Sequence, residues 1–311
     1  MKATVYRSTG SWYTAKAQDG TLWQCRIKGR LKIDEEITST NPVAVGDEVM
    51  LEPEPESGEQ PTAQITDICP RNNYMVRSSP HHRLQKHIVA ANLDQVMLVA
   101  TLREPRTSAG FIDRFLVTAA AYHIPAVIVF NKSDLHRRKE EEQAAEWQAL
   151  YSSIGYPVLF TSAETGKGIA ALQEILVNKS TLISGHSGVG KSTLINLLLP
   201  DLRLKTQSVS GWSGKGLHTT TFAEMFDLPG GGKLIDTPGI REFGIVDMEK
   251  AELSHYFVEM QPYLVHCQFN NCLHLNEPGC AVKRAVEEGK ISVERYASYL
   301  KVLDSLSEPE W

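Results

Sequence analysis

A glycine-rich run that ends in lysine and serine is the segment with the clearest chemistry. Residues 185–192 read Gly-His-Ser-Gly-Val-Gly-Lys-Ser, between an apolar run typical of a strand and a helical pattern at residues 193–199. Glycines let backbone N–H groups surround a phosphate at a helix N-terminus, while the lysine reaches phosphate oxygens and the serine ligates Mg²⁺. The run predicts a nucleoside triphosphate site formed by Gly185, His186, Ser187, Gly188, Val189, Gly190, Lys191, Ser192 and Thr193.

A second motif, Asp-Thr-Pro-Gly at residues 236–239, ends the strand predicted at residues 233–236. In a nucleotide site, Asp236 would lie beside the hydrated Mg²⁺ and the Gly239 amide would face the γ-phosphate. This short pattern carries little information alone. Because a phosphate-binding run is present in the same chain, it becomes a specific prediction.

Residues 131–134 read Asn-Lys-Ser-Asp and resemble the motif with which GTPases read guanine. Asp134 would accept from guanine N1–H and the 2-amino group, which implies roughly 10²–10⁴-fold preference for GTP over ATP. The backbone after the next predicted strand would donate to guanine O6. A helix N-cap at Ser133 or Asp134 is an alternative, compatible with this role. The predicted guanine contacts are Asn131, Lys132, Ser133, Asp134, Ser162 and Ala163.

Three threonines lie where a GTPase carries the switch threonine that completes the Mg²⁺ shell. Residues 216–221 read Gly-Leu-His-Thr-Thr-Thr, between the phosphate-binding run and the Asp-Thr-Pro-Gly motif. The sequence does not choose among Thr219, Thr220 and Thr221. The candidate Mg²⁺ ligands are Ser192 and one of these threonines, Thr219 and Thr220 among them.

Ile240 follows Asp-Thr-Pro-Gly at the position where Ras-like enzymes carry the glutamine that orients the attacking water. We therefore expect slow hydrolysis by the protein alone. His218, next to the switch threonines, is the best replacement and is the predicted catalytic residue. The alternative is that His218 is a loop histidine without a catalytic role.

The order of the motifs differs from that of an ordinary GTPase. The guanine motifs precede the phosphate-binding run, whereas they usually follow the Asp-x-x-Gly motif. Moving the chain ends between surface loops leaves the same sheet and the same pocket. The sequence therefore predicts a circularly permuted GTPase domain.

Three cysteines and a histidine lie close together near the C-terminus, at Cys267, Cys272, His274 and Cys280. Three thiolates and an imidazole suit a closed, tetrahedral Zn²⁺ site, which has no open position for catalysis. Structural zinc contributes an apparent ~10–16 kcal/mol in small peptides, so the metal would stabilise a thin core. Free cysteines are the alternative.

The length of 311 residues predicts two or three domains to carry these motifs. Residues 1–70 contain short strands typical of a five-stranded barrel, for which an OB-fold is the usual solution and an SH3-like barrel the alternative. Residues 71–91 are predicted as a basic linker, residues 92–245 as a doubly wound α/β domain, and residues 246–311 as helical. The predicted strands are residues 4–7, 12–17, 21–27, 47–52, 63–69, 96–101, 126–131, 158–161, 181–185 and 233–236, and the clearest helices residues 112–122 and 292–306.

Aromatic and basic side chains in the first third could contact nucleic acid. Trp12, Tyr13 and Trp23 are either platforms for bases or part of the core, which is the commoner role in a small barrel. A stretch without acidic residues could meet phosphate or be a solvated linker. Its basic residues are Arg71, Arg77, Arg83 and Lys86.

Composition and charge exclude several classes of protein. The chain has a formal net charge of −5 and 42% hydrophobic residues, as expected for a globular protein. Its apolar runs are too short for a membrane span, and five unevenly spaced cysteines do not fit a secreted disulfide framework. We expect a cytoplasmic protein without a membrane partner.

These motifs, in this order, resemble the RsgA family of small-ribosomal-subunit-dependent GTPases, also called YjeQ or YloQ. The resemblance covers nearly the whole chain, and Leu217 is a small departure where the family often carries a basic residue. It implies an OB-fold barrel, a permuted GTPase domain, a zinc domain, and a role in late maturation of the small ribosomal subunit through contact with rRNA.

The prediction is therefore a monomeric GTPase that binds GTP and GDP with Mg²⁺, holds one structural Zn²⁺ and is activated by the small ribosomal subunit. One alternative is a nucleotide-binding RNA adaptor without meaningful turnover, which the missing glutamine favours. Another is a small-molecule kinase that uses the phosphate-binding run, although the guanine motif argues against it.

Overall fold

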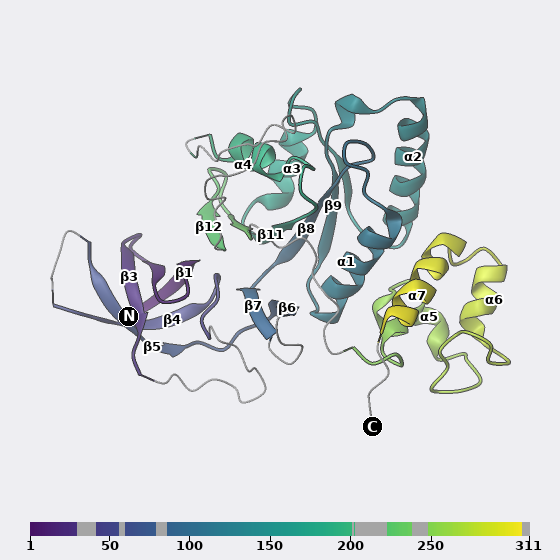
Figure 1. The fold of residues 1–311 in the computed structure, drawn as a ribbon, viewed down its shortest axis with the longest axis horizontal. Coiled ribbons are helices and arrows are strands. Elements are labelled where there is room, and N and C mark those ends of the chain that lie inside the picture. The colour runs from purple at the N-terminus through teal and green to yellow at the C-terminus, as the bar shows by residue number, and fades with distance from the viewer. Residues whose placement is uncertain are drawn as a thin grey trace, which may run out of the picture.

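The computed structural model describes residues 1–29, 42–55, 60–78, 86–200, 202, 223–237 and 248–306. Within these ranges the chain forms an N-terminal barrel, a central α/β domain and a group of C-terminal helices (Figure 1).

The N-terminal strands close into a barrel. β1 (Lys2–Ser8), β2 (Tyr13–Ala17), β3 (Leu22–Ile27), β5 (Thr62–Ile68) and β4 (Glu48–Pro53) are neighbours in that order, and β4 also pairs with β1. β3 and β5 are parallel, whereas the other neighbouring pairs are antiparallel. This closed five-stranded barrel confirms the predicted OB-fold.

The three aromatic side chains predicted as candidates, Trp12, Tyr13 and Trp23, have different surroundings. Tyr13 is buried in the barrel core, and Trp23 packs against that core while partly exposed. Trp12 is 38% exposed, and the guanidinium carbon of Arg26 lies 3.8 Å from its ring centroid. Of these three residues, only Trp12 therefore offers both a ring and a cation at the surface.

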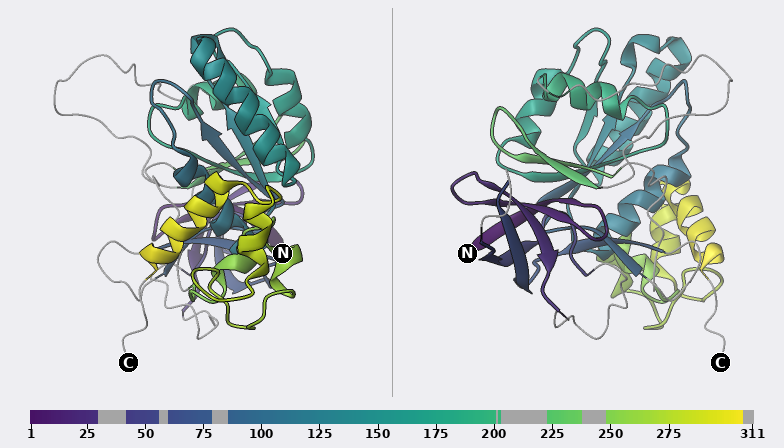
Figure 2. Two further views of the ribbon diagram at one scale, coloured as in Figure 1. Left: turned by 90° about the vertical axis from the view of Figure 1, so that its right-hand side faces the viewer. Right: turned by 60° about the vertical axis from the view of Figure 1, so that its left-hand side comes forward.

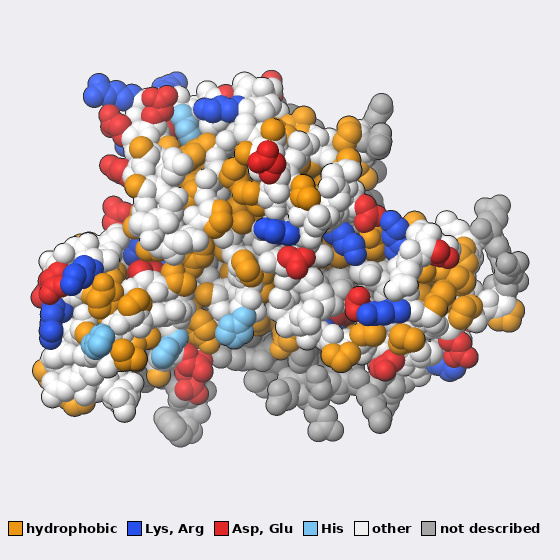
Figure 3. Space-filling view, turned by 180° about the vertical axis from the view of Figure 1, so that it is seen from behind, with side chains coloured by type: hydrophobic (Ala, Val, Ile, Leu, Met, Phe, Trp, Pro, Cys, Tyr) orange, Lys and Arg blue, Asp and Glu red, His pale blue; other side chains and the backbone are white. Residues whose placement is uncertain are grey.

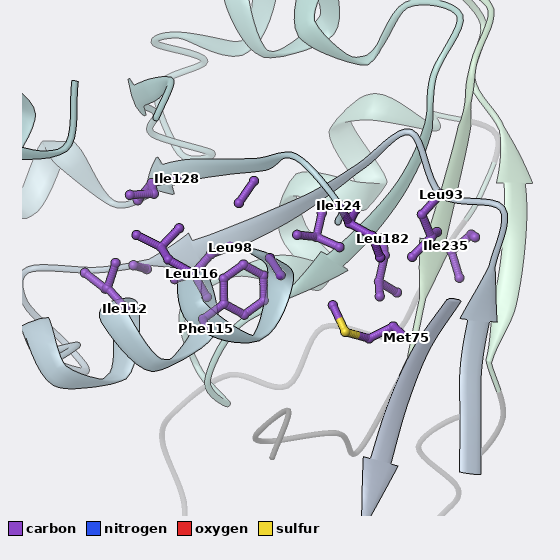
Figure 4. Close-up of a cluster of buried hydrophobic side chains, with 14 of the residues drawn as sticks. Met75, Leu93, Leu98, Ile112, Phe115, Leu116, Ile124, Ile128, Leu182 and Ile235 are labelled. Atoms are coloured by element: carbon purple, nitrogen blue, oxygen red, sulfur yellow. The ribbon is translucent and has the colours of Figure 1, made fainter. Parts of the chain in front are cut away.

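The segment predicted as a basic linker contains a hairpin, which corrects that prediction. β6 (Tyr74–Ser78) and β7 (Lys86–Ala91) pair antiparallel, and Met75 packs in the same apolar cluster as the α/β domain (Figure 4). Arg71 donates through Nε to Oδ1 of the buried Asp47 at 2.6 Å. Its guanidinium therefore already has an anionic partner within the protein. The side chains of Arg77 and Lys86, and all of Arg83, lie outside the described residues.

The central sheet runs in the order β10, β9, β8, β11, β13, β12. The first five strands are parallel, and β12 is antiparallel to β13. Five strands match the sequence prediction, whereas β12 was not predicted. The bounds are β8 (Gln95–Ala100), β9 (Ala126–Phe130), β10 (Val158–Phe160), β11 (Ser180–Ser184), β12 (Glu224–Asp227) and β13 (Lys233–Asp236).

Helices cover both faces of this sheet because alternate strand residues point to opposite sides. α1 (Ala109–Ala121) and α2 (Arg138–Ser153) pack against one face, and α3 (Ile169–Leu176) and α4 (Lys191–Leu198) against the other. Charged side chains of both signs gather along the outer edge formed by α2 (Figure 3). The predicted doubly wound α/β domain is confirmed.

The C-terminal helices pack beside α1 in all three ribbon views (Figures 1 and 2). They comprise the 3₁₀ turn η2 (Leu253–Tyr256) and the helices α5 (Gln261–Leu264), α6 (Ala281–Glu287) and α7 (Val293–Ser305). Ser292 caps α7 by accepting from the backbone N–H groups of Glu294 and Arg295. Among the described residues, no helix has the length and apolar character to cross a membrane.

The barrel is joined to the α/β domain through a shared sheet. Arg7 of β1 pairs with Glu224 of β12. Beside this pairing, Tyr6 Oη donates to Asp227 Oδ1 at 2.6 Å, and Lys16 Nζ donates to Asp227 Oδ2 at 2.5 Å. The strand that follows the predicted switch threonines is thus in contact with the barrel.

Candidate functional site

The predicted motifs meet at the carboxyl edge of the central sheet. The glycine-rich loop follows β11, Asp236 ends β13, and the two guanine motifs follow β9 and β10. In an open parallel sheet, ligands bind at this edge, where strand ends and helix N-termini converge. The permuted chain order therefore leaves the spatial arrangement of a GTPase intact.

The glycine-rich loop is held so tightly that two of its glycines have no room for a side chain. A Cβ on Gly185, whose φ is +145°, would lie 2.2 Å from the carbonyl oxygen of Val99. A Cβ on Gly190 would lie 2.4 Å from Asn131 Nδ2. The loop leads directly into α4 at Lys191, so its N–H groups and the helix N-terminus can face one anion.

Lys191 and Asp236 place opposite charges beside this loop. Lys191 Nζ donates to the carbonyl oxygens of Gly185 at 2.5 Å and His186 at 2.8 Å. Burial lowers the pKa of Lys191, an effect that the Asp236 carboxylate opposes, and burial raises the pKa of Asp236, which Lys191 opposes. A bound phosphate would favour the ammonium and a bound Mg²⁺ the carboxylate, so both groups suit a magnesium nucleotide.

Asn131 connects the glycine-rich loop to both guanine motifs. Its buried side chain donates through Nδ2 to the Val189 carbonyl oxygen at 2.9 Å. Its Oδ1 accepts from Thr161 Oγ1 at 3.1 Å and from the Ala163 N–H at 3.3 Å. Sequence reasoning did not identify Thr161, because nothing in its spacing distinguishes its hydroxyl from that of other strand threonines.

The acidic residue of the guanine motif is held by a serine of the second motif. Ser162 Oγ donates to Asp134 Oδ1, which leaves a second carboxylate oxygen for a base. Ser133 and Asp134 lie in the short turn η1 (Ser133–Leu135), and the following helix is capped at Arg137. The alternative role of Ser133 or Asp134 as a helix N-cap is therefore not supported. Lys132, which precedes η1, takes the left-handed conformation, with a φ of 60°.

Part of the predicted site lies outside the described residues. This applies to His218, Thr219, Thr220, Thr221 and Gly239, whose roles stay predictions. Ser192 lies in the first turn of α4, as a Mg²⁺ ligand requires, and Asp236 is the last residue of β13.

The four predicted zinc ligands converge. The ligand atoms of Cys267, Cys272, His274 and Cys280 all lie within 4.8 Å of one another, with His274 Nδ1 at 3.4 Å from Cys280 Sγ. Burial raises the pKa of the Cys272 thiol to about 12 and lowers that of His274. Zn²⁺ would favour the thiolates, and the Cys₃His donor set fits one tetrahedral ion. This convergence counts against unrelated free cysteines.

Comparison with known proteins agrees with this arrangement. Residues 2–58 match the model of the RsgA N-terminal domain and residues 68–246 that of the RsgA GTPase. A protein of Bacteroides fragilis named small ribosomal subunit biogenesis GTPase RsgA is 50% identical over 100% of this chain and 99% of its own length. A protein of the same name from Flavobacterium psychrophilum is 52% identical over 99% of this chain and 94% of its own length.

Two solved structures share the whole architecture. YjeQ from Thermotoga maritima is 34% identical, with a TM-score of 0.78 and 98% coverage of both chains. YloQ, described as a circularly permuted GTPase, is 28% identical with a TM-score of 0.73, covering 100% of this chain and 96% of its own. The same family thus matches the barrel, the permuted sheet and the full length, and this chain belongs to the RsgA family of GTP-hydrolysing, circularly permuted GTPases.

Proposed function

We propose that this GTPase acts in late maturation of the small ribosomal subunit, hydrolysing GTP slowly alone and faster on the subunit. The observation that carries the proposal is the convergence of both guanine motifs, the glycine-rich loop and Asp236 at one sheet edge. Relatives that match 99–100% of this chain are named small ribosomal subunit biogenesis GTPases, which supports a role on that subunit. Slow hydrolysis alone follows from Ile240, which stands in place of a water-orienting glutamine.

The phosphates of GTP would bind the N–H groups of residues 185–190 and the ammonium of Lys191. Ser192 would ligate Mg²⁺, with Thr219 or Thr220 completing its shell, and Asp236 would hold a water of that shell. When bound, Mg²⁺ neutralises charge that develops on the phosphate oxygens. The Gly239 N–H would face the γ-phosphate.

His218 is the proposed residue that positions the attacking water. If so, His218→Ala leaves the affinity for GTP nearly unchanged and removes most of the subunit-stimulated turnover, because the interaction is made in the transition state. An equal loss of GTP affinity would make His218 a binding residue instead.

Asp134 is proposed to select guanine. Asp134→Asn exchanges an acceptor for a donor, so GTP binding weakens while xanthosine triphosphate, with an acceptor at position 2, binds better. Competition between the two nucleotides for the full-length protein measures this change. Glu164→Gln, an exposed acid next to the second guanine motif, is the control. An unchanged preference for GTP in Asp134→Asn would remove this role.

We infer that the barrel contacts rRNA through the exposed pair of Trp12 and Arg26. A base can stack on an aromatic ring with a guanidinium over it, which is a sequence-tolerant contact. Trp12→Ala should weaken binding to small subunits, whereas Leu22→Ala, which truncates another exposed apolar side chain of the barrel, should not. Equal binding by both variants would place the rRNA contact elsewhere.

Zinc is proposed as one structural ion in the C-terminal domain, because four protein ligands leave no position for a substrate. All the site residues come from a single chain, so a monomer suffices, and its proposed place is the cytoplasm, where ribosomal subunits mature.

GTP hydrolysis with purified small subunits, with large subunits and with neither tests the function. The proposal expects a low rate alone, a clear increase with small subunits and none with large subunits. Equal rates in all three would contradict activation. Nucleotide binding without turnover on either subunit would favour the RNA adaptor.

A further inference from the structure

Arg295 of α7 is a cation buried between the C-terminal helices and the GTPase domain, with a side chain only 1% exposed. Its guanidinium donates to Glu259 through Nε at 2.6 Å and Nη2 at 3.1 Å, and to Asp113 Oδ1 through Nη1 at 2.6 Å. It also lies 4.7 Å from the ring centroid of Phe257. Although burial disfavours the charged form, the two carboxylates raise the pKa of Arg295 above its ordinary value.

Asp113, a partner of Arg295, belongs to α1 and also accepts a hydrogen bond from within the GTPase domain. Tyr151 Oη of α2 donates to Asp113 Oδ1 at 2.9 Å, and both residues are buried. One residue further along α1, Arg114 donates to Ser305 Oγ of α7 at 3.1 Å. One turn beyond Asp113, Val117 packs into the apolar cluster of the C-terminal helices. α1 is therefore fixed to those helices by ionic, polar and apolar contacts.

The first turn of α1 reaches the glycine-rich loop. The ring of Phe111 stacks on the His186 imidazole, with centroids 3.7 Å apart and planes at 30°. The carbonyl oxygen of His186 accepts from Lys191 Nζ at 2.8 Å. Pro105, in the segment that leads into α1, lies 3.5 Å from the position of a Cβ on Gly188. A displacement of α1 would therefore move groups that touch the phosphate-binding loop.

From these contacts we infer that Arg295 is a positioning residue of the nucleotide site, acting through Asp113 and Phe111 on His186. The guanidinium fixes α1, and α1 holds the aromatic stack against the loop that surrounds the phosphates. The inference rests on the proposed function and deepens it, since it gives the C-terminal domain a route to the nucleotide. Because coupling is reciprocal, nucleotide binding strengthens the docking of the C-terminal helices by the same factor.

The test measures the release of fluorescently labelled GDP from the full-length protein, chased with unlabelled GDP and without ribosomal subunits. The variants are Arg295→Met, Phe111→Leu and the double variant. Each single change should accelerate release roughly 2–30-fold. The double variant should release GDP no faster than the faster single variant, because both substitutions interrupt one route. Lys301→Met removes an exposed cation from the same helix and should leave the rate unchanged.

A purely structural role for Arg295 predicts a different result. Loosening of the whole protein would accelerate release regardless of Phe111, so the two single effects would multiply in the double variant. That outcome, or a wild-type rate in a folded Arg295→Met variant, would overturn the inference. Zinc content and far-UV circular dichroism establish that each variant is folded.

Arg295→Met leaves two carboxylates buried without their cation, and a variant that does not fold could not be tested. A milder variant therefore tests the same route. Tyr151→Phe removes only one donor to Asp113. It should give a smaller acceleration that disappears in the Phe111→Leu background, and an acceleration that persists there would contradict the route. Lack of subunit-stimulated hydrolysis would contradict the proposed function and leave these release rates unaffected, so the two failures are distinguishable.

Discussion

Two clusters of like composition lie where the GTPase domain meets its neighbours, and they differ mainly in their surroundings. In each, one aspartate accepts from a tyrosine hydroxyl and from a cation. At the C-terminal helices these residues are Tyr151, Asp113 and Arg295, and at the barrel they are Tyr6, Asp227 and Lys16.

Exposure separates the two clusters. The side chains of Arg295 and Asp113 are 1% and 2% exposed, whereas those of Lys16 and Asp227 are 31% and 47% exposed. Exposed ion pairs contribute about 0–1 kcal/mol because water and salt screen them. Removing one partner of a buried pair costs about 3–5 kcal/mol because a charge is left without water or partner. A tyrosine, an aspartate and a cation are therefore costly to disrupt at the C-terminal joint, where Glu259 adds a second carboxylate, and contribute little at the barrel joint.

Removal of zinc should have the largest effect, and only at the C-terminal joint. Structural zinc contributes an apparent ~10–16 kcal/mol in small peptides. Cys272→Ser should therefore lose the metal and unfold α5 to α7, measured by elemental analysis and far-UV circular dichroism. Cys69→Ser, at a cysteine outside the cluster, is the control. Metal-free protein with undiminished helicity would contradict this prediction.

Loss of the buried cation should have the next largest effect. Arg295→Met leaves Asp113 and Glu259 buried without a cation, so we expect a loss of about 3–5 kcal/mol in the free energy of unfolding. Urea titration followed by circular dichroism measures it. Arg138→Met, whose side chain is 92% exposed in its pair with Glu142, is the control. Similar losses in both variants would mean that burial does not decide the cost of removing a cation from an ion pair.

At the barrel joint, Asp227→Asn should change the free energy of unfolding by about 1 kcal/mol or less, since the pair with Lys16 is exposed. The amide still accepts from Tyr6, so mainly the ionic part is removed. The same urea titration provides the measurement. A loss as large as that of Arg295→Met would mean that exposure does not decide the strength of these clusters.

Sequence reasoning predicted what is local in the chain. The glycine-rich loop, the guanine motif and the zinc ligands have fixed spacings, and the barrel is predicted from short strands separated by Gly, Pro, Asp and Glu turns. β12 was missed because it has only four residues and is acidic at both ends. The basic and histidine residues of the hairpin are typical of a linker, whereas its apolar residues, such as Met75 and Val89, pack in the core.

The two clusters could not be predicted from spacing. Arg295 and Asp113 are 182 residues apart in the chain, and Tyr6 and Asp227 are 221 apart. Each residue alone is typical of a solvated surface, and nothing local says which carboxylate becomes buried. The stack of Phe111 on His186 was missed for the same reason, because it depends on how α1 lies against the loop.

The smallest expected effect is the pH dependence of the barrel joint. Burial alone would raise the pKa of Asp227, but hydrogen bonds from Lys16 and Tyr6 and the nearby Lys233 lower it below the ordinary value of 3.8. A carboxylate with a lowered pKa contributes stability above its unfolded-state pKa and loses it as the pH falls through the folded-state value. The difference in unfolding free energy between wild type and Asp227→Asn should therefore be constant near neutral pH and shrink below a pH of about 4. Lys28→Met, which breaks an exposed pair with Glu52 within the barrel, is the reference: the hydrogen bond from Lys28 lowers the pKa of Glu52 too, so its difference from wild type should shrink in the same way. A difference that does not change with pH would mean that Asp227 acts through its shape and hydrogen bonds. The negative charge of Asp227 would then contribute nothing to the stability of the barrel joint.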